Sequence, residues 1–332
     1  MAYLLVTIDT EEDMPKWRPE KVSSTENISK LPFLHAFLKQ HGVQPTYLVN
    51  QPVLENNDSL NVVKGLAAEG GCEIGAHLHS WNTPPLSKIE KQGTATYLSR
   101  QEKAIKRAKL THFTNLFHEK MGFFPTSYRA GRYGFCQDSA QILSELGYRV
   151  DSSIAPLIDF SSDGGPNFKS FDAHPFWFTN SEANKILEVP ISISLVHNFP
   201  KYFEKFYFQI PNWTKIKGII HRTNLARLLW LRPTTYSAKE MRQLADYLLD
   251  QEGVSFLNIM FHSSEVYPGA TPYNKTENDV AMFYERLSNI LGYLIESKFL
   301  KSCTLTGFEE ICSKSEKKLK TISITEEAKG LF

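Results

Sequence analysis

The amino-acid sequence predicts an α/β fold built on a mainly parallel sheet. Short apolar runs alternate along the 332-residue chain with amphipathic segments of helical periodicity, and the connections between them are short. Polar residues suited to catalysis directly follow several of the apolar runs. This is typical of parallel α/β barrels and doubly wound sheets, whose sites lie at the carboxyl ends of the strands. The chain shows no internal repeat and no linker, so one domain is expected over residues 1–312.

Strands and helices alternate regularly over the first half of the chain. Residues 3–8 form a continuous apolar run, which is typical of a strand buried on both faces of a parallel sheet. Ser29 is expected to cap a helix that stops at Gly42, and Asp58 a helix that stops at Gly70. Strands are expected at 3–8, 45–49, 72–76 and 127–130, and helices at 29–41, 58–70, 97–120 and 138–147.

The second half predicts the same alternation with two interruptions. Strands are expected at 148–151, 185–194, 255–261 and 303–306, and helices at 241–250, 277–297 and after the last strand. The first interruption is an insertion at 196–235, with seven basic residues, one acid and many aromatic residues, including Lys201 and Trp213. Such a segment could bind a glycan, a phosphorylated lipid head group or a membrane surface, or pack as an extra subdomain on the barrel. The second, 313–332, is rich in Lys, Glu and Ser and predicts a flexible tail.

Composition and charge are ordinary for a globular protein. Apolar residues make up 42% of the chain and charged residues 22%, and the formal net charge is +1. No global field therefore favours nucleic acid or an acidic membrane. Four scattered cysteines without a CxxC pair favour reduced thiols. No apolar run approaches a membrane span, and the first residues lack a basic n-region and a cleavage site, so a cytoplasmic protein is expected.

Two histidines follow the strand predicted at 72–76. His77 and His79 alternate along an extended chain and therefore point to the same side. Two neutral imidazoles on one side of a strand end could bind one divalent cation. Taken alone, such a pair is more often two ordinary polar loop residues.

Other predicted strand ends carry residues that complete such a site. Asp9 and Glu11 follow the first strand on one side of the chain, Arg129 lies on the fourth strand and His262 ends the late one. Because the carboxyl ends of parallel strands meet at one edge, these groups are expected to converge. Together they offer metal ligands, a carboxylate base and a histidine acid.

Five segments of the chain resemble the motifs of polysaccharide deacetylases of the NodB-homology type and occur in the family's order. They are 6–13 (VTIDTEED), 73–77 (EIGAH), 128–134 (YRAGRYG), 150–153 (VDSS) and 259–262 (IMFH). The variants at 77–85 (HLHSWNTPP) and 261–269 (FHSSEVYPG) resemble a branch associated with bacterial surface-polysaccharide synthesis. The resemblance implies a distorted (β/α) barrel that removes N- or O-acetyl groups from sugars with a divalent metal. Zinc is the first expectation, with cobalt, nickel or manganese as alternatives.

The resemblance also implies roles for individual residues. Asp9 matches the base that takes a proton from the attacking water, and Arg129 the arginine that orients this base. Glu11 and His77 match metal ligands. One departure is that Trp81 stands where the family has its second metal histidine, so either His79 replaces it or the site has a single histidine and binds metal weakly. Thr10 also stands where the first motif usually has a second aspartate.

The acid half of the implied mechanism lies at the other end of the chain. His262 matches the histidine that protonates the leaving group, and Asp151 the acid that steadies it. Residues within or beside the motifs are expected to contact the substrate, and Trp81 offers a flat surface on which a sugar ring stacks. The expected substrate contacts are Trp81, Asn82, Arg132, Tyr133 and Glu265.

The leading hypothesis is a metal-dependent deacetylase of a sugar or glycan precursor. Alternatives are a hydrolase of a non-sugar amide, a non-catalytic glycan-binding protein and a structural partner in a polysaccharide-synthesis complex. The retention of Asp9, Arg129, Asp151 and His262 together favours an enzyme, because a binding protein needs no acid–base pair. Peripheral membrane contact through 196–235 is a further expectation.

Overall fold

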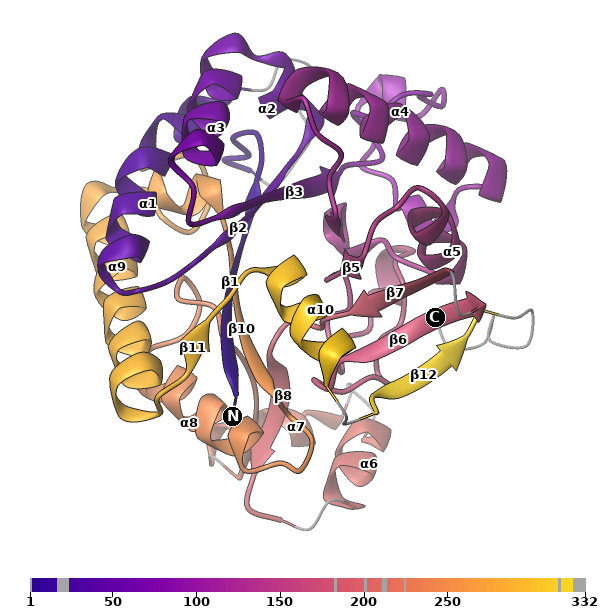
Figure 1. The fold of residues 1–332 in the computed structure, drawn as a ribbon. Coiled ribbons are helices and arrows are strands. Elements are labelled where there is room, and N and C mark those ends of the chain that lie inside the picture. The colour runs from indigo at the N-terminus through magenta and orange to yellow at the C-terminus, as the bar shows by residue number, and fades with distance from the viewer. Residues whose placement is uncertain are drawn as a thin grey trace.

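The computed structural model describes residues 2–16, 24–181, 184–199, 202–210, 214–223, 225–315 and 318–324. Its centre is a mostly parallel ten-stranded sheet with the order β10-β1-β2-β3-β4-β5-β7-β6-β12, in which β11 also pairs with β1. Helices surround the strands, and α10 covers one end of them (Figure 1). The parallel strands are β1 (Tyr3–Thr10), β2 (Thr46–Val49), β3 (Glu73–Leu78), β4 (Ser127–Ala130), β5 (Val150–Asp151), β10 (Phe256–His262) and β11 (Lys301–Ser302).

The sheet forms a distorted barrel because its strands part after β5. There β7 (Asn184–Glu188) pairs with β5 and runs outward in an antiparallel pair with β6 (Phe176–Ser181). The segment after β7 turns back to the barrel, where Ser192 N donates to Asn258 O of β10 at 3.3 Å. This segment closes the ring between β5 and β10. The predicted distorted (β/α) barrel is confirmed.

The helices of the outer layer pack their apolar stripes on the outward side of the strands. Leu4, Val6 and Ile8 of β1 belong to this large cluster. The helices of this layer are α1 (Leu31–Gln40), α2 (Gln51–Glu55), α3 (Asn57–Glu69), α4 (Lys103–Met121), α5 (Gln137–Glu145), α8 (Ala238–Leu249) and α9 (Glu277–Gly292), whereas α10 (Leu305–Lys314) lies across one end of the barrel. No helix in the described ranges has the length and apolar character needed to cross a bilayer.

The inward-facing residues of β1 show that the barrel interior changes from apolar to polar along the strands. Leu5 belongs to an apolar cluster with Phe256 of β10 and Phe308 of α10, which closes the amino end of the barrel. Two residues on, Thr7 donates to Asn258 at 2.8 Å in a buried polar layer. After two more residues Asp9 opens into the cavity at the carboxyl end. Because every second residue of a strand faces the interior, β1 places a polar site above an apolar layer of the barrel.

Several predicted boundaries were wrong for local reasons. Asn56, not Asp58, caps α3 by accepting from Ser59 N at 3.0 Å. Ser29 lies in a 3-10 turn before α1 and caps no helix. The helix predicted at 97–120 begins only at Lys103, after a 3-10 turn.

Two predicted strands were also wrong. The strand expected at 185–194 is divided into β7 and β8 (Ile193–His197) around Pro190, which lacks the N–H that a ladder needs. The strand expected at 303–306 ends at Ser302, because Thr304 caps α10 by accepting from Gly307 N at 3.1 Å.

The expected flexible tail is corrected in part. Residues 320–323 form β12 (Lys320–Ser323), which pairs in parallel with β6. The exposed edge of β6 provides unpaired backbone groups for this strand. The parts of the predicted tail at 316–317 and 325–332 lie outside the described residues.

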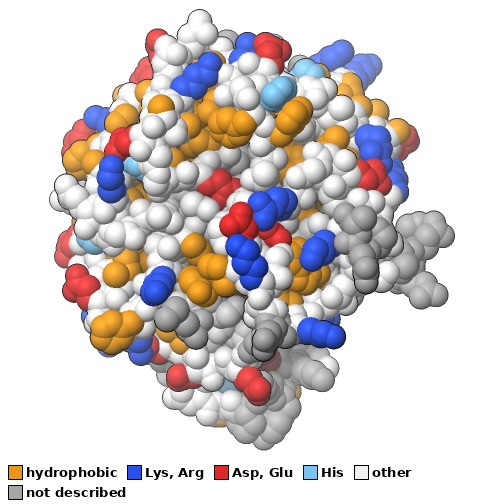
Figure 2. All heavy atoms as spheres, in the orientation of Figure 1, with side chains coloured by type: hydrophobic (Ala, Val, Ile, Leu, Met, Phe, Trp, Pro, Cys, Tyr) orange, Lys and Arg blue, Asp and Glu red, His pale blue; other side chains and the backbone are white. Residues whose placement is uncertain are grey.

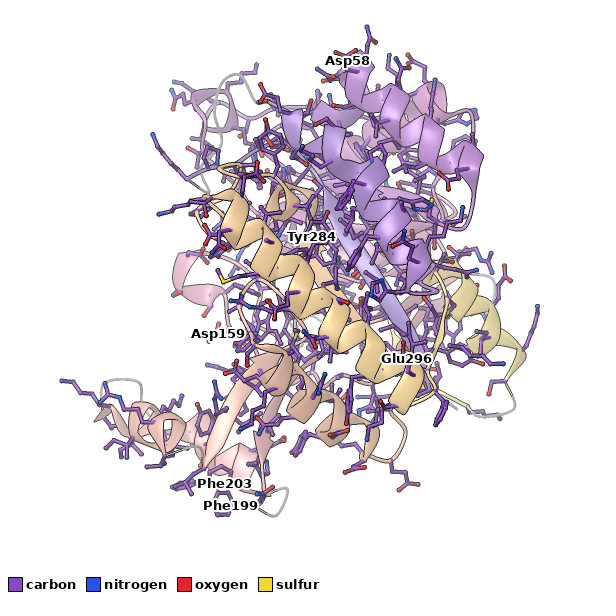
Figure 3. All side chains as sticks on the ribbon, turned by 90° about the vertical axis from the view of Figure 1, so that its left-hand side faces the viewer. Asp58, Asp159, Phe199, Phe203, Tyr284 and Glu296 are labelled. Atoms are coloured by element: carbon purple, nitrogen blue, oxygen red, sulfur yellow. The ribbon has the colours of Figure 1, made fainter. Side chains whose placement is uncertain are left out.

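The insertion expected at 196–235 is a small α/β unit attached to the barrel. It consists of an antiparallel pair, β8 and β9 (Ala226–Trp230), with α6 (Tyr202–Gln209) and α7 (Ile216–Arg222) between the two strands. Figure 3 shows this unit as a projection at the lower end of the molecule, with the labelled Phe199 and Phe203 at its edge. Lys201 and Trp213, named among its basic and aromatic residues, lie outside the described residues.

Candidate active site

A buried group of metal-ligand type lies at the carboxyl end of the barrel. Glu11, His77 and His79 each offer one ligand atom, and these atoms lie within 4.8 Å of one another. Glu11 Oε2 is 3.3 Å from His77 Nε2 and 3.0 Å from His79 Nε2, and the two Nε2 atoms are 3.0 Å apart. Ligands of a tetrahedral zinc ion at about 2.0–2.1 Å are roughly 3.3 Å apart. The spacing of the three atoms therefore fits a small divalent cation.

The outer nitrogens of the two rings explain why the inner ones attract a cation. His77 Nδ1 lies 3.0 Å from the backbone O of Arg129, and His79 Nδ1 lies 3.2 Å from Glu12 Oε1. Both partners can only accept, so each Nδ1 carries a proton, and in the neutral form of either ring Nε2 directs a lone pair toward the other ring. Together with the Glu11 carboxylate, three acceptors converge on one point, an arrangement that requires a metal ion or a proton between them. The residues present thus fit a metal.

Glu12 supports this group from behind, a role that the sequence did not suggest. It accepts from His79 and from the amides of Asn50 and Asn82, the latter at 3.1 Å. Burial would lower the pKa of His79, but the Glu12 and Glu11 carboxylates raise it to about 10. Carboxylates that hold the outer nitrogen of a metal-binding histidine fix its ring and increase its basicity.

Gly75 shows how tightly β3 is packed where it leads to His77. A Cβ at this position would lie 2.2 Å from Ser127 Oγ and 2.8 Å from Leu48 Cδ2. The absence of a side chain lets β3 approach β2 and β4 inside the barrel. This close approach brings His77 to the backbone of Arg129, with which it is in register.

Arg129 holds the candidate base in place. Its Nη1 donates to Asp9 Oδ1 at 2.7 Å, and its other nitrogens donate to Thr7 Oγ1 and to the backbone and side chain of Ser152. Burial alone would raise the pKa of Asp9, but the Arg129 guanidinium and the neighbouring His77 and His262 hold it below its ordinary value. Asp9 is therefore an ionised carboxylate whose second oxygen is free to accept a proton.

His262 faces Asp9 across the β1–β10 pair, in which the two residues are in register. Its Nε2 lies 3.9 Å from Asp9 Oδ2 and 3.9 Å from Glu11 Oε1. Glu11 Oε1 is buried and has no hydrogen-bond partner among the described residues, so it too is directed toward this space. Asp9, Glu11 and His262 thus face one point, and the predicted convergence of these strand ends is found.

The expected partner of His262 was wrong. Asp151 is instead hydrogen-bonded by Ser153 Oγ at 2.7 Å and Ser153 N at 3.0 Å, and it shares a hydrogen bond with Glu188. Burial raises the pKa of both carboxyls, and that of Glu188 lies well above its usual range. The pair therefore holds a proton more readily than two isolated carboxyls would. The pair lies in register on β5 and β7, and Arg129 is close enough to both carboxyls to act on their pKa values electrostatically.

Glu265 takes the role expected of Asp151. Its Oε1 lies 2.8 Å from His262 Nδ1, and the carboxylate also accepts from Arg232 and Thr234. Burial would raise the pKa of Glu265, but Arg232 and His262 lower it to about 2. Glu265 was expected to contact substrate, yet it is fully buried. Its position three residues after His262, on a 3-10 turn, was the available signal.

Replacing Glu265 with glutamine is expected to lower kcat/KM about 10- to 100-fold and to move its alkaline limb to lower pH. Burial lowers the pKa of His262, whereas Glu11 and Glu265 raise it above its ordinary value. A histidine that acts as an acid is active only below its pKa. Loss of the Glu265 charge lowers the pKa of His262, so activity declines at a lower pH. The pH–rate profile measures this change, and Thr234→Val, which leaves the charge in place, is the control. An unchanged alkaline limb in Glu265→Gln would contradict the assignment.

The site opens into a cavity of about 670 Å³. This volume lies in the ordinary range for small-molecule sites. Besides the catalytic groups, the lining includes five aromatic residues and two arginines. They are Trp81, Tyr97, Tyr133, Phe160, Tyr273, Arg132 and Arg232.

Three of the residues expected to bind substrate line this cavity. Trp81 stacks on the ring of His79, with centroids 4.2 Å apart. Arg132 lies over the Tyr97 ring at 4.1 Å and donates to Asp163 at 2.6 Å. Tyr133 stacks on Phe160. Arg132 and Tyr133 have φ values of 53° and 57°, which a non-glycine residue adopts at a cost of about 1–3 kcal/mol.

Asn82 differs from the other residues that were expected to contact the substrate. It is not among the residues that line the cavity, and its amide donates to Glu12. It belongs to the support of His79. Arg232, in contrast, was counted only as part of the basic insertion, although it lines the cavity beside His262.

No protein-family model matches the chain, and no curated protein matches its sequence. Solved structures do match. A protein described as a polysaccharide deacetylase from Mycobacterium smegmatis is similar over 97% of this chain and 94% of its own, with a TM-score of 0.56 and 14% identity. A glycoside hydrolase/deacetylase from Parabacteroides distasonis is similar over 95% and 72%, with a TM-score of 0.60 and 10% identity.

A third match agrees with the first two. A polysaccharide deacetylase from Pseudomonas aeruginosa is similar over 95% of this chain and 91% of its own, with a TM-score of 0.54 and 13% identity. At such identities the likeness shows the fold. The chain therefore has the fold found in polysaccharide deacetylases, as the order of its motifs predicted.

Proposed function

We propose that this protein is a metal-dependent hydrolase that removes acetyl groups from a sugar or glycan precursor. The observation that carries the proposal is the convergence of three acceptors, Glu11 Oε2 and the Nε2 atoms of His77 and His79, beside an ionised aspartate and a histidine. The fold shared with polysaccharide deacetylases supports the same reaction.

Glu11, His77 and His79 would hold the metal. A divalent ion bound there would polarise the acetyl carbonyl and make a water molecule more acidic. Zinc suits a ligand set of two imidazoles and one carboxylate, and cobalt, nickel or manganese could replace it. Glu12 and the Arg129 carbonyl keep both rings in the tautomer that leaves Nε2 free to bind.

Asp9 acts as the general base in this proposal. Arg129 donates a hydrogen bond to Oδ1 of Asp9, so Oδ2 of the same carboxylate is directed toward the cavity and His262. The buried arginine keeps the carboxylate ionised, so it accepts the proton of the attacking water. Burial raises the pKa of Asp151 and Glu188, and Arg129 acts electrostatically on both carboxyls as well as on Asp9.

His262 acts as the general acid. Glu265 accepts a hydrogen bond from His262 Nδ1, and Nε2 of the same ring faces Asp9 and Glu11. The neighbouring carboxylates raise the pKa of this histidine and favour its protonated form. It then donates a proton from Nε2 to the leaving amine or alcohol.

The cavity walls support a sugar as the substrate. Trp81, Tyr97 and Tyr133 present aromatic surfaces beside the charged groups. The faces of sugar rings are apolar and stack on such surfaces, while the arginines and carboxylates of the rim offer hydrogen bonds to hydroxyl groups. The breadth of the cavity favours a sugar or glycan over a small heterocycle.

Acetate release from acetylated sugars, measured together with bound metal, tests the proposal. We expect about one divalent ion per chain after purification, acetate release that stops when a chelator removes the ion, and recovery on adding zinc. Acetylated amino sugars and O-acetylated sugars, assayed side by side, distinguish an amide from an ester substrate. Release of ammonia from a non-sugar amide with no acetate from any sugar would assign the site to the other hydrolase class. If the folded protein binds sugars but neither holds metal nor hydrolyses any substrate, it is a binding protein instead.

A further inference from the structure

The insertion exposes apolar side chains that its own small core does not use. That core contains Leu195, Tyr207 and Ala226, with Phe203, Phe208 and Ile220 packed against it. On α6, Phe203 and Tyr207 are four residues apart and face inward, whereas Phe206 is 59% exposed. On α7, Ile220 faces inward, whereas Ile216 and Ile219 are 44% and 61% exposed. Among the described residues of this unit, five large apolar ones are exposed, namely Phe199, Phe206, Ile216, Ile219 and Leu225.

Basic residues accompany the exposed apolar ones. Ile216, Ile219 and Arg222 are three residues apart and form one stripe on α7, and Lys215 precedes it. Lys215 and Arg222 are both exposed, and neither has an ion-pair partner among the described residues. The single acid of the insertion, Glu204, lies close to His197 and Tyr247. The outward surface of α6 and α7 therefore combines apolar and positively charged groups.

On the face of the molecule drawn in Figure 2, the acidic and basic side chains are interspersed, and apolar groups lie between them. The molecule carries a net charge of only +1, so the basic excess of seven to one in 196–235 is a local property.

A series of neighbouring residues links the insertion to the wall of the candidate active site. Lys217 of α7 is close enough to Lys169 to interact with it electrostatically, and Lys169 donates to Asp159 at 2.7 Å. The loop that follows Asp159 supplies Phe160 and Asp163 to the cavity wall. The strand that ends the insertion leads to Arg232, which also lines the cavity.

We propose that the outward surface of α6 and α7 docks on a lipid membrane that contains anionic lipids. Apolar side chains on one helix face with basic residues beside them are typical of helices that lie in the membrane interface. Anionic head groups attract the unpaired Lys215 and Arg222, and the isoleucines and Phe206 enter the boundary of the acyl chains. A membrane matches both properties, because its surface is negative and its interior apolar. The cavity entrance would then lie close to the lipid surface.

Co-sedimentation with vesicles tests the proposal independently of catalysis. We expect the full chain to bind vesicles of phosphatidylcholine with phosphatidylglycerol, to bind pure phosphatidylcholine vesicles much less, and to lose affinity as salt is raised. Protein treated with chelator should bind equally, since the metal group lies inside the barrel. A failure of the proposed hydrolase activity would therefore leave this result unchanged.

Paired variants separate the contributions of charge and apolar contact. Lys215→Gln with Arg222→Gln should lower the partition coefficient roughly 25-fold, because two basic residues at the membrane surface are lost. Ile216→Ser with Ile219→Ser should lower it at least about tenfold. The matched controls Lys30→Gln with Lys64→Gln and Phe33→Ser, on exposed residues outside the insertion, should bind as the wild type does. All these side chains are exposed, so thermal unfolding should be unchanged.

Three outcomes would overturn the proposal. One is equal sedimentation with both kinds of vesicle. Another is a loss of binding in the control variants as large as in the α7 variants. The third is a dimer that Ile216→Ser with Ile219→Ser dissociates, without vesicle binding by the wild type, which would assign this surface to a second copy of the chain.

Discussion

Asp9→Asn is expected to lower kcat by about 10²- to 10⁴-fold while bound metal stays at the wild-type level. This range is the usual contribution of a positioned general base. The metal level should be unaffected, because Asp9 is not among the three residues whose ligand atoms converge. Initial rates of acetate release and metal analysis of the same preparation measure the two quantities.

Asparagine is the informative replacement because of Arg129. Its carbonyl oxygen still accepts the hydrogen bond from Arg129 Nη1, so the arginine stays in place. Alanine would remove the carboxylate that pairs with the buried Arg129 cation, at a cost of about 3–5 kcal/mol in stability. Asp163→Asn is the matched control, since it makes the same chemical change on the far wall of the cavity, where it should alter KM more than kcat. An Asp9→Asn variant that turns over within tenfold of wild type would show that another group is the base.

His79→Ala is expected to reduce metal affinity by more than about 100-fold and to abolish acetate release. Removal of one of three converging ligands leaves Glu11 and His77, which are too few to hold a divalent ion firmly. Glu12→Gln should have an intermediate effect of about 10- to 100-fold, because it changes only the partner of His79 Nδ1. Zinc titration of the chelator-treated proteins measures both affinities.

The control for the predicted loss of metal affinity is the replacement of a histidine outside the cavity. His174 lies on the surface, where it contacts the backbone of Glu252, and His174→Ala should bind zinc as the wild type does. If His79→Ala retains one firmly bound ion, then His79 is not a ligand. The replacement of the family's second metal histidine by Trp81 would then have another explanation.

Local sequence determined most of the barrel and the chemical groups at its centre. The apolar run of β1 and the late strand that ends at His262 could be predicted because buried parallel strands are continuous in hydrophobicity. Alternation in extended chain predicted that Asp9 and Glu11, and likewise His77 and His79, would point to one side. Convergence of the strand ends then brought these pairs together.

Tertiary structure decided which of the surrounding residues support the chemistry. Sequence order suggested Asp151 as the partner of His262, but β5 and β7 place Asp151 against Glu188, and the turn after β10 brings Glu265 to the histidine. Glu12 and Arg232 carry no sequence signal, because their roles depend on side chains that are 67 and 33 residues away.

The histidine pair illustrates the same division. The sequence placed His77 and His79 on one side of the chain, at the edge where the strands end. Only the fold supplied the Arg129 carbonyl and the Glu12 carboxylate, which orient the rings so that the two Nε2 atoms face Glu11. Periodicity fixes the direction of a side chain along its own strand, whereas the direction of a lone pair depends on partners from other strands.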